Sequence, residues 1–259
     1  MGRDSNIEWT HHTFNPWWGC VNVSPACDHC YAENLAKRFG TQWGKDTERR
    51  FFGDRHWNEP LKWDVAAQAA GVRQRVFCAS MADVFEDRDD LFESRQRLWA
   101  LTRETPHLDW LLLTKRPWNI PRMFPKDWLH TPQANVWLGT TAENQKWADQ
   151  RWDALSRCEA VVRFLSCEPL LGPISFEKWG TLPDWIIVGG ESGGRSRPME
   201  PAWAQHMRDQ CVGSHVPFFF KQWGEHNAGL VKIGKHAAGR TLDGKLWSQV
   251  PHPHYQEVM

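Results

Sequence analysis

Three cysteines near the N-terminus, Cys20, Cys27 and Cys30, lie within eleven residues of one another along the chain. Six residues separate the first two and two residues separate the last two. An aromatic run with a proline, 13–19, precedes them, and 31–39 reads as a helix, so we expect Cys30 near a helical first turn. A helix N-terminus favours the thiolate, which is the form of cysteine that binds metal. The spacing therefore predicts a metal centre.

The number of thiols limits the kind of centre. Three cysteines cannot pair among themselves, and residues 1–6 are polar and unlike a secretory signal, so we do not expect a disulfide framework. A zinc site needs a fourth ligand, which His11, His12 or His29 could supply. Otherwise three thiolates hold three irons of a four-iron cluster and leave the fourth iron open. Purely structural thiols are the third alternative.

Composition narrows the class of protein. The chain has 259 residues, and its 31 Lys and Arg balance its 31 Asp and Glu, so no overall basic field indicates nucleic acid. No apolar run is long enough to span a membrane, and we expect a cytoplasmic protein. The 18 tryptophans fill the core or stack on bases, and we favour the core.

From residue 75 onward, short apolar runs alternate with helical segments. Continuous rather than alternating apolar runs are typical of buried parallel strands in βαβ units. With a first strand at 8–14 they predict an α/β fold of about seven mainly parallel strands, as a partial or near-complete (β/α) barrel, although a doubly wound sheet also fits. The other runs lie at 75–80, 109–116, 135–141, 161–169, 184–192 and 217–223.

Helix boundaries are predicted from capping residues. Asp90 with Glu93 predicts the start of a helix over 91–103, and Thr140 with Glu143 the start of one reaching Arg157. Pro201 suits the first turn of a helix over 201–211.

We expect residues 1–225 to form one barrel-like domain and 226–259 to form an appendage. The appendage contains a β-hairpin over 240–247, on the turn Asp243-Gly244, and about a dozen loose final residues.

Polar side chains follow most of the apolar runs. The C-terminal ends of barrel strands converge on one face, so we expect these residues to line one cavity with the cysteine loop at its rim. The glycine-rich loop 189–194 allows close approach of a ligand, and Arg195 and Arg197 after it suit an anion. The strand-end residues expected to line this cavity are Ser80, Asp83, Lys115, Glu143, Glu168, Glu191 and Lys221.

Several motifs together resemble a family of phage and bacterial proteins of unknown function, named after two mycobacteriophage gene products. The motifs lie at 15–30, 77–85, 113–117, 163–173, 188–193 and 219–224. The resemblance implies a radical S-adenosylmethionine (SAM)-like protein, because of the three-cysteine loop, and a separate partner protein encoded nearby. Typical radical SAM enzymes space the cysteines by three and then two residues, and place Gly-Gly-Glu after the second strand rather than at 189–191.

The leading hypothesis is an iron–sulfur enzyme of radical SAM type that uses an electron donor and acts on an unidentified substrate, for which a nucleotide or a nucleic-acid base is our guess. Cys20, Cys27 and Cys30 would hold a [4Fe-4S] cluster and be catalytic. SAM would be bound by Ser80, Asp83, Glu168, Gly189, Gly190 and Glu191. The substrate would be bound by Lys115, Arg116, Glu143, Arg195, Arg197 and Lys221. The alternatives are a zinc-containing, nucleic-acid-binding phage accessory protein without catalysis, and a cluster protein without turnover.

Overall fold

The computed structural model describes residues 2–252, and within them the chain forms two compact units. Unit 1 comprises residues 2–23, 32–138 and 158–161, and unit 2 comprises 24–31, 139–157 and 162–252. Each unit is described by itself.

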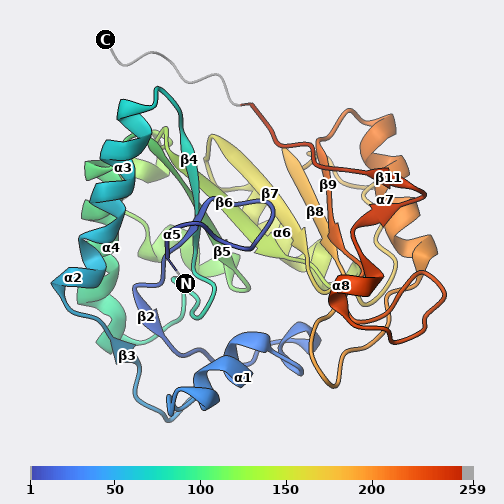
Figure 1. The fold of residues 1–259 in the computed structure, drawn as a ribbon. Helices are drawn as coiled ribbons and strands as arrows, with labels where there is room; N and C mark the ends of the chain where they lie inside the picture. The colour runs from blue at the N-terminus through green and yellow to red at the C-terminus, as the bar shows by residue number, and fades with distance from the viewer. Residues whose placement is uncertain (1, 253–259) are drawn as a thin grey trace. The chain divides into compact units, whose positions relative to one another are not determined.

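In unit 1, helices and short turns accompany the first strands of the sheet, and α3 packs against β4, β5 and α4 (Figure 1). The strands are β1 (His12–Thr13), β2 (Trp17–Trp18), β3 (Arg50–Phe51), β4 (Gln74–Cys78) and β5 (Leu108–Thr114). The α-helices are α1 (Tyr31–Arg38, whose first residue is assigned to unit 2), α2 (Asp54–Trp57), α3 (Glu59–Ala69), α4 (Phe92–Glu104) and α5 (Ile120–Met123). The 3₁₀ helices are η2 (Asp89–Leu91), η3 (Pro117–Asn119) and η4 (Lys126–Leu129).

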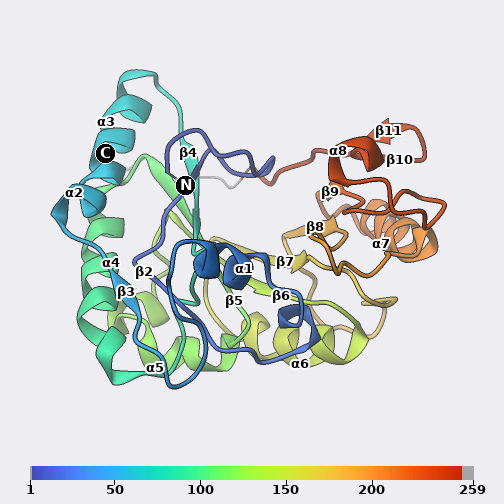
Figure 2. The same cartoon turned by 60° about the horizontal axis from the view of Figure 1, so that its bottom comes forward.

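Unit 2 holds the later strands and a C-terminal hairpin, which lies beside α7 in both views (Figures 1 and 2). Asp243 in the hairpin turn accepts hydrogen bonds from Gln205 and Arg208 of α7. The strands are β6 (Val136–Thr141), β7 (Val162–Cys167), β8 (Trp185–Gly189), β9 (Phe218–Gln222), β10 (Thr241–Leu242) and β11 (Lys245–Leu246). The first three residues of β6 belong to unit 1. The helices are η1 (Pro25–Cys27), α6 (Gln145–Ser156), α7 (Pro201–Gly213) and α8 (Lys235–Ala238).

Seven strands form one sheet in the order β1-β4-β5-β6-β7-β8-β9. The pairs β1–β4, β4–β5, β7–β8 and β8–β9 are all parallel. Every residue of β6 and β8 is buried, because helices cover a parallel sheet on its faces and no side is left for polar residues. The predicted α/β fold with about seven mainly parallel strands is confirmed, and β1 and β9 end the order, so the sheet has the partial-barrel topology.

The tryptophans fill the core. Seven of the 18 are among the largest fully buried side chains, and of all 18 only Trp118 is among the exposed large hydrophobic residues. The preference for core tryptophans is therefore confirmed for most of them. The fully buried ones are Trp9, Trp17, Trp99, Trp110, Trp128, Trp137 and Trp185.

Two predicted helix starts are wrong. Leu91, not Asp90, stands at the N-cap of α4, and Asp90 instead binds Arg88, because the 3₁₀ turn η2 occupies residues 89–91. Asn144, rather than Thr140, caps α6 by accepting from the Trp147 amide.

The other local predictions hold. Pro201 is the first residue of α7, as predicted. The hairpin turn at Asp243 and Gly244 is confirmed, with φ values of 51° and 74° at the two positions, as an Asp-Gly turn requires. Of the dozen final residues predicted to be loose, those from 253 onward lie outside the described residues, and the Gln249 amide before them donates to the Phe218 carbonyl of β9 at 3.2 Å.

A side chain at Gly139 in β6 has no room. A Cβ there would lie 2.2 Å from Cζ of Phe164, a fully buried ring of β7. We expect Gly139→Ala to lower the free energy of unfolding by about 1–3 kcal/mol through overpacking, measured by urea denaturation. Gly180→Ala, where a Cβ would meet nothing within 4 Å, is the control and should leave it unchanged. Equal effects of the two changes would contradict the packing argument.

Candidate functional site

The segment that carries Cys27 and Cys30 folds locally as a 3₁₀ turn followed by a helix. In η1 the Cys27 amide donates to the Ser24 carbonyl at 2.8 Å. The Cys30 amide donates to the Cys27 carbonyl at 3.3 Å, and α1 begins at Tyr31. The prediction of a loop that enters a helix, with Cys30 beside its first turn, is confirmed.

Two of the three cysteines of the N-terminal loop are less buried than the other four cysteines of the chain. All seven cysteines are free thiols, and Cys20 and Cys30 are half-buried while Cys27 is 7% exposed. Burial raises the pKa of the Cys20 thiol to about 12; Asp83 adds to this effect and Arg116 opposes it. The other four are buried in strands, in a helix or at a helix end: Cys78, Cys158, Cys167 and Cys211.

In unit 1, Asp83 and Arg116 hold the first part of the cysteine loop. Arg116 Nη1 donates to Asp83 Oδ2 at 2.7 Å and lies 3.7 Å from Cys20 Sγ, while Nη2 donates to the Val21 carbonyl at 2.9 Å. Asp83 is 4% exposed and also accepts from Thr114 Oγ1 at 2.7 Å. Burial alone would raise the pKa of Asp83, but Arg116 and these hydrogen bonds outweigh it and lower the pKa. Two strand-end charges thus position Cys20 and Val21.

The neighbouring strand-end residues of unit 1 join the same structure. The Lys115 amide donates to Asp83 Oδ2 at 3.1 Å. The Ser80 hydroxyl accepts from Asn15 Nδ2 at 3.1 Å, and Asn15 Oδ1 accepts from the Met81 amide at 2.7 Å. Ser80 therefore connects the loop after β4 to the aromatic run that precedes Cys20.

In unit 2, Glu143 holds the turn that contains Cys27. Glu143 and Arg151 are both fully buried, and Arg151 Nη1 donates to Glu143 Oε2 at 2.7 Å. The other carboxylate oxygen of Glu143 accepts from the Ala26 amide at 3.4 Å. The sequence suggested a substrate-binding role for Glu143, whereas the structure places it in a buried ion pair beside η1.

Glu191 and Arg197 of unit 2 hold the same segment from another direction. Glu191 Oε2 accepts from His29 Nδ1 at 3.0 Å and from Arg197 Nε at 3.0 Å. Arg197 Nη2 donates to the Pro25 carbonyl at 2.8 Å, and its Nη1 lies 3.3 Å from Asp28 Oδ2. Burial would raise the pKa of Glu191, but the hydrogen bonds from Arg197 and His29 outweigh it, so the pKa is lowered.

Glu168 and Lys221 form a separate ion pair in unit 2. Lys221 Nζ lies 2.7 Å from Glu168 Oε2, and the strand between them, β8, ends in Gly189. A Cβ on Gly189 would lie 3.2 Å from that same oxygen, so the glycine leaves room for the pair. Gly190 lies so close to Trp223 that a Cβ would overlap the Trp223 carbonyl. Arg195 is exposed.

The histidines considered as zinc ligands lie in different surroundings. His11 Nδ1 accepts from the Arg75 amide at 2.8 Å, and His12 Nε2 lies 2.8 Å from Gln74 Oε1. His29 lies between Cys27 and Cys30 in the chain, with Nδ1 on Glu191. Among residues 2–252, no three His, Cys, Asp or Glu side chains are gathered as a metal site. The groups whose chemistry suits a metal are therefore the three thiols of the loop and His29, whose ring is oriented by Glu191, while the Arg116 guanidinium at Cys20 is no ligand.

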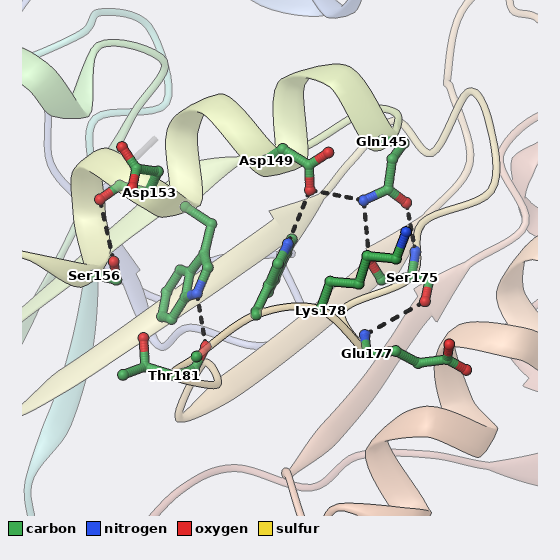
Figure 3. A pocket seen from close by; sticks show the side chains of 11 residues that line it. Gln145, Asp149, Asp153, Ser156, Ser175, Glu177, Lys178 and Thr181 are labelled. Atoms are coloured by element: carbon green, nitrogen blue, oxygen red, sulfur yellow. Dashed lines mark hydrogen bonds between the residues drawn. The ribbon is translucent and has the colours of Figure 1, made fainter.

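Two cavities lie elsewhere, and none of the predicted site residues lines either of them. In unit 2, a cavity of about 650 Å³ lies between α6 and residues 175–181 (Figure 3). Asp149 there accepts from Gln145 and from Trp179, at 2.8 Å each, and Trp152 donates to the Thr181 carbonyl. These hydrogen bonds between lining residues fasten the segment to α6.

The second cavity, of about 730 Å³, lies in unit 1. Aromatic side chains from distant parts of the chain line it, among them Phe14, Trp18, Phe52, His56 and Trp63. Sequence reasoning missed this site, because its rings come from two segments with no shared motif. The only signal was the excess of aromatic residues in 9–18 and 51–63.

Removing the charge of Glu191 should loosen the turn that contains Cys27. We expect Glu191→Gln to speed hydrogen exchange of residues 25–31 roughly tenfold, because charge-assisted hydrogen bonds to His29 and Arg197 weaken. Hydrogen exchange by mass spectrometry measures this, with the exposed Glu177→Gln as control. If hydrogen exchange of residues 25–31 is unchanged in Glu191→Gln, the contacts of Glu143 with Ala26 and of Arg197 with Pro25 are enough to hold the turn.

Within the described residues, no helix has the length and apolar character to cross a membrane. No curated protein matches the chain. A family described as protein of unknown function (DUF5131) matches residues 4–251, nearly the whole sequence. This match spans the cysteine loop, the seven-stranded sheet and the C-terminal hairpin alike, and the chain belongs to that family.

Proposed function

We propose that this protein is an iron–sulfur enzyme of radical SAM type, with Cys20, Cys27 and Cys30 as the three protein ligands of a [4Fe-4S] cluster. One observation carries the proposal: buried charged residues of the strand ends are used to hold the cysteine loop. Asp83 with Arg116 holds Cys20, and Glu143 and Glu191 hold the turn around Cys27. A core built only for stability has little need of such buried charges, because they are costly to desolvate.

The three thiols of the loop are ligands of the type that an iron–sulfur cluster requires. When bound, a four-iron cluster with one open iron takes the amino and carboxylate groups of SAM and supplies the electron that cleaves its sulfonium. The Arg116 guanidinium, 3.7 Å from Cys20 Sγ, opposes the rise that burial causes in the pKa of this thiol, and ligation of the metal would remove the proton that remains. Cys30 directly precedes α1, so a metal-bound thiolate there would lie at a helix N-terminus.

The other strand-end residues divide into two groups. Asp83, Arg116, Glu143, Glu191 and Arg197 act as positioning residues, because their hydrogen bonds go to the cysteine loop or to one another. Glu168 and Lys221, a less buried pair at the ends of β7 and β9, are the residues that we propose for contacts with SAM or substrate, together with the backbone of Gly189. We also propose ligand binding by four further residues: Ser80, Lys115, Gly190 and the exposed Arg195.

A zinc centre is the second candidate, and one observation favours it. His29 Nδ1 lies 3.0 Å from Glu191 Oε2, which leaves Nε2 for another partner. Metal-binding histidines commonly have such a carboxylate behind them. Cys27, His29 and Cys30 would then supply ligands from four consecutive residues of chain, in a protein without turnover.

Metal analysis separates the two candidates. The protein is purified anaerobically, its iron, sulfide and zinc are measured, and its visible spectrum is recorded. After reduction, SAM is added and 5′-deoxyadenosine is assayed. Iron with sulfide and formation of 5′-deoxyadenosine support the enzyme. One tightly held zinc per chain without iron uptake or product supports the second candidate, and iron without product supports a cluster protein without turnover.

A further inference from the structure

We infer that the aromatic cavity of unit 1 binds an unpaired nucleotide, with its base among the rings of Trp18, Phe52 and His56 and its phosphate on Arg50 and Arg55. Two sources share this chemistry: a free mononucleotide and a nucleotide within a single strand. The inference does not rest on the proposed function, because such binding needs neither iron nor SAM.

The aromatic rings that line the cavity differ in how much of each side chain is exposed to solvent. Phe14 and Trp63 are buried, whereas Trp18, Phe52 and His56 are half-buried. Phe52 lies 4.4 Å from the His56 ring, and Trp18 lies 5.7 Å from Phe52, edge to face. Aromatic side chains that stay partly open to solvent are the surfaces on which proteins stack unpaired bases.

Cations accompany these rings. The Arg50 guanidinium lies 4.8 Å from the centre of the Trp18 ring and 5.5 Å from that of Phe52. The antiparallel pairing of β2 with β3 sets this position, because Trp18 faces Arg50 in the register. A guanidinium fixed over rings offers both a stacking plane and donors for phosphate.

The balance of charge around the cavity favours an anion. The two carboxylates that line it are each engaged by a cation, Asp54 by Arg97 and Glu59 by Lys62. Arg50 and Arg55 make no ion pair with a described residue. The cations thus exceed the free carboxylates where a phosphate would lie.

One polar group at the cavity suits the edge of a base. His56 Nε2 donates to the Asn15 carbonyl at 2.8 Å, so Nδ1 of the neutral ring is an acceptor. Burial lowers the pKa of His56, which keeps the ring neutral near pH 7.

The test measures binding by the full chain. A fluorescein-labelled single strand of about 12 nucleotides, within the site sizes of single-strand binders, is followed by anisotropy. AMP and UMP are followed by calorimetry. We expect at least one of these probes to bind, and binding of the strand to weaken as salt rises, because Arg50 and Arg55 contact phosphate. Binding of the strand alone or of a mononucleotide alone identifies the source. No binding of either overturns the inference.

Variants locate the site. Phe52→Ala should weaken binding roughly 5- to 150-fold, the range for loss of one stacked base, whereas Phe52→Trp should retain it. Arg50→Gln should weaken binding and reduce its salt dependence. Phe92→Ala, which removes an aromatic ring 55% exposed on α4, is the matched control and should leave binding unchanged. Binding that Phe52→Ala and Arg50→Gln leave intact, in variants with unchanged circular dichroism, places the ligand elsewhere and overturns the inference.

Discussion

Replacing Cys27 by alanine will abolish iron binding and formation of 5′-deoxyadenosine together. The proposed cluster has three protein ligands, and loss of one thiolate leaves two irons without a protein ligand. We expect iron to fall from about four per chain to a trace, and product to fall below detection. Cys20→Ala and Cys30→Ala should lose iron and product to the same extent. The surroundings of these two cysteines differ, because Cys20 lies beside Arg116 and Cys30 directly precedes α1. Iron analysis and chromatography of the reaction measure both effects.

Two further variants make this result specific. Cys158→Ala removes a buried thiol outside the loop and should keep both iron and product. His29→Ala separates the candidate centres, because a cluster held by three thiolates keeps its iron, whereas a zinc site that uses His29 loses its metal. Full iron content in Cys27→Ala, or product formation by Cys20→Ala, would contradict the proposed ligand set.

Replacing Glu143 by glutamine will destabilise the protein by about 3–5 kcal/mol, because it leaves the charge of Arg151 buried and unpaired. Both side chains are fully buried, with Arg151 Nη1 2.7 Å from Glu143 Oε2. The amide is nearly isosteric with the carboxylate, so packing changes little and the lost charge dominates. Urea denaturation measures the loss as a lower midpoint at unchanged slope.

The same helix supplies the control. Asp153 and Arg157 form an exposed ion pair in and just after α6, so Asp153→Asn should cost less than about 0.5 kcal/mol. The double change Glu143→Gln with Arg151→Met should recover most of the stability, because it removes the unpaired charge as well. If Glu143→Gln alone does not lower the free energy of unfolding, water or another group must compensate the buried charge of Arg151.

The identity of the charged strand-end residues followed from local pattern. A buried parallel strand is a continuous apolar run, and the first polar residue after it marks its end, so Asp83, Glu143 and Glu191 were found as such. Their partners were not predictable, because each pair joins residues far apart in sequence, as Glu191 with His29 does. Arg116, Glu143 and Glu191, which we expected to face a ligand, have hydrogen bonds to the cysteine loop.

The sequence by itself determined the α/β class, the parallel strands, the helix after Cys30 and the Asp243-Gly244 hairpin. These depend on periodicity and on the local conformations that a few residue types allow. Only the tertiary structure decided that Arg116 lies on Cys20, that Arg151 neutralises Glu143 and that Arg50 lies over Trp18. The reason is physical: a side chain's partner is set by which chain segments pack together, and distant segments leave no mark in the local pattern.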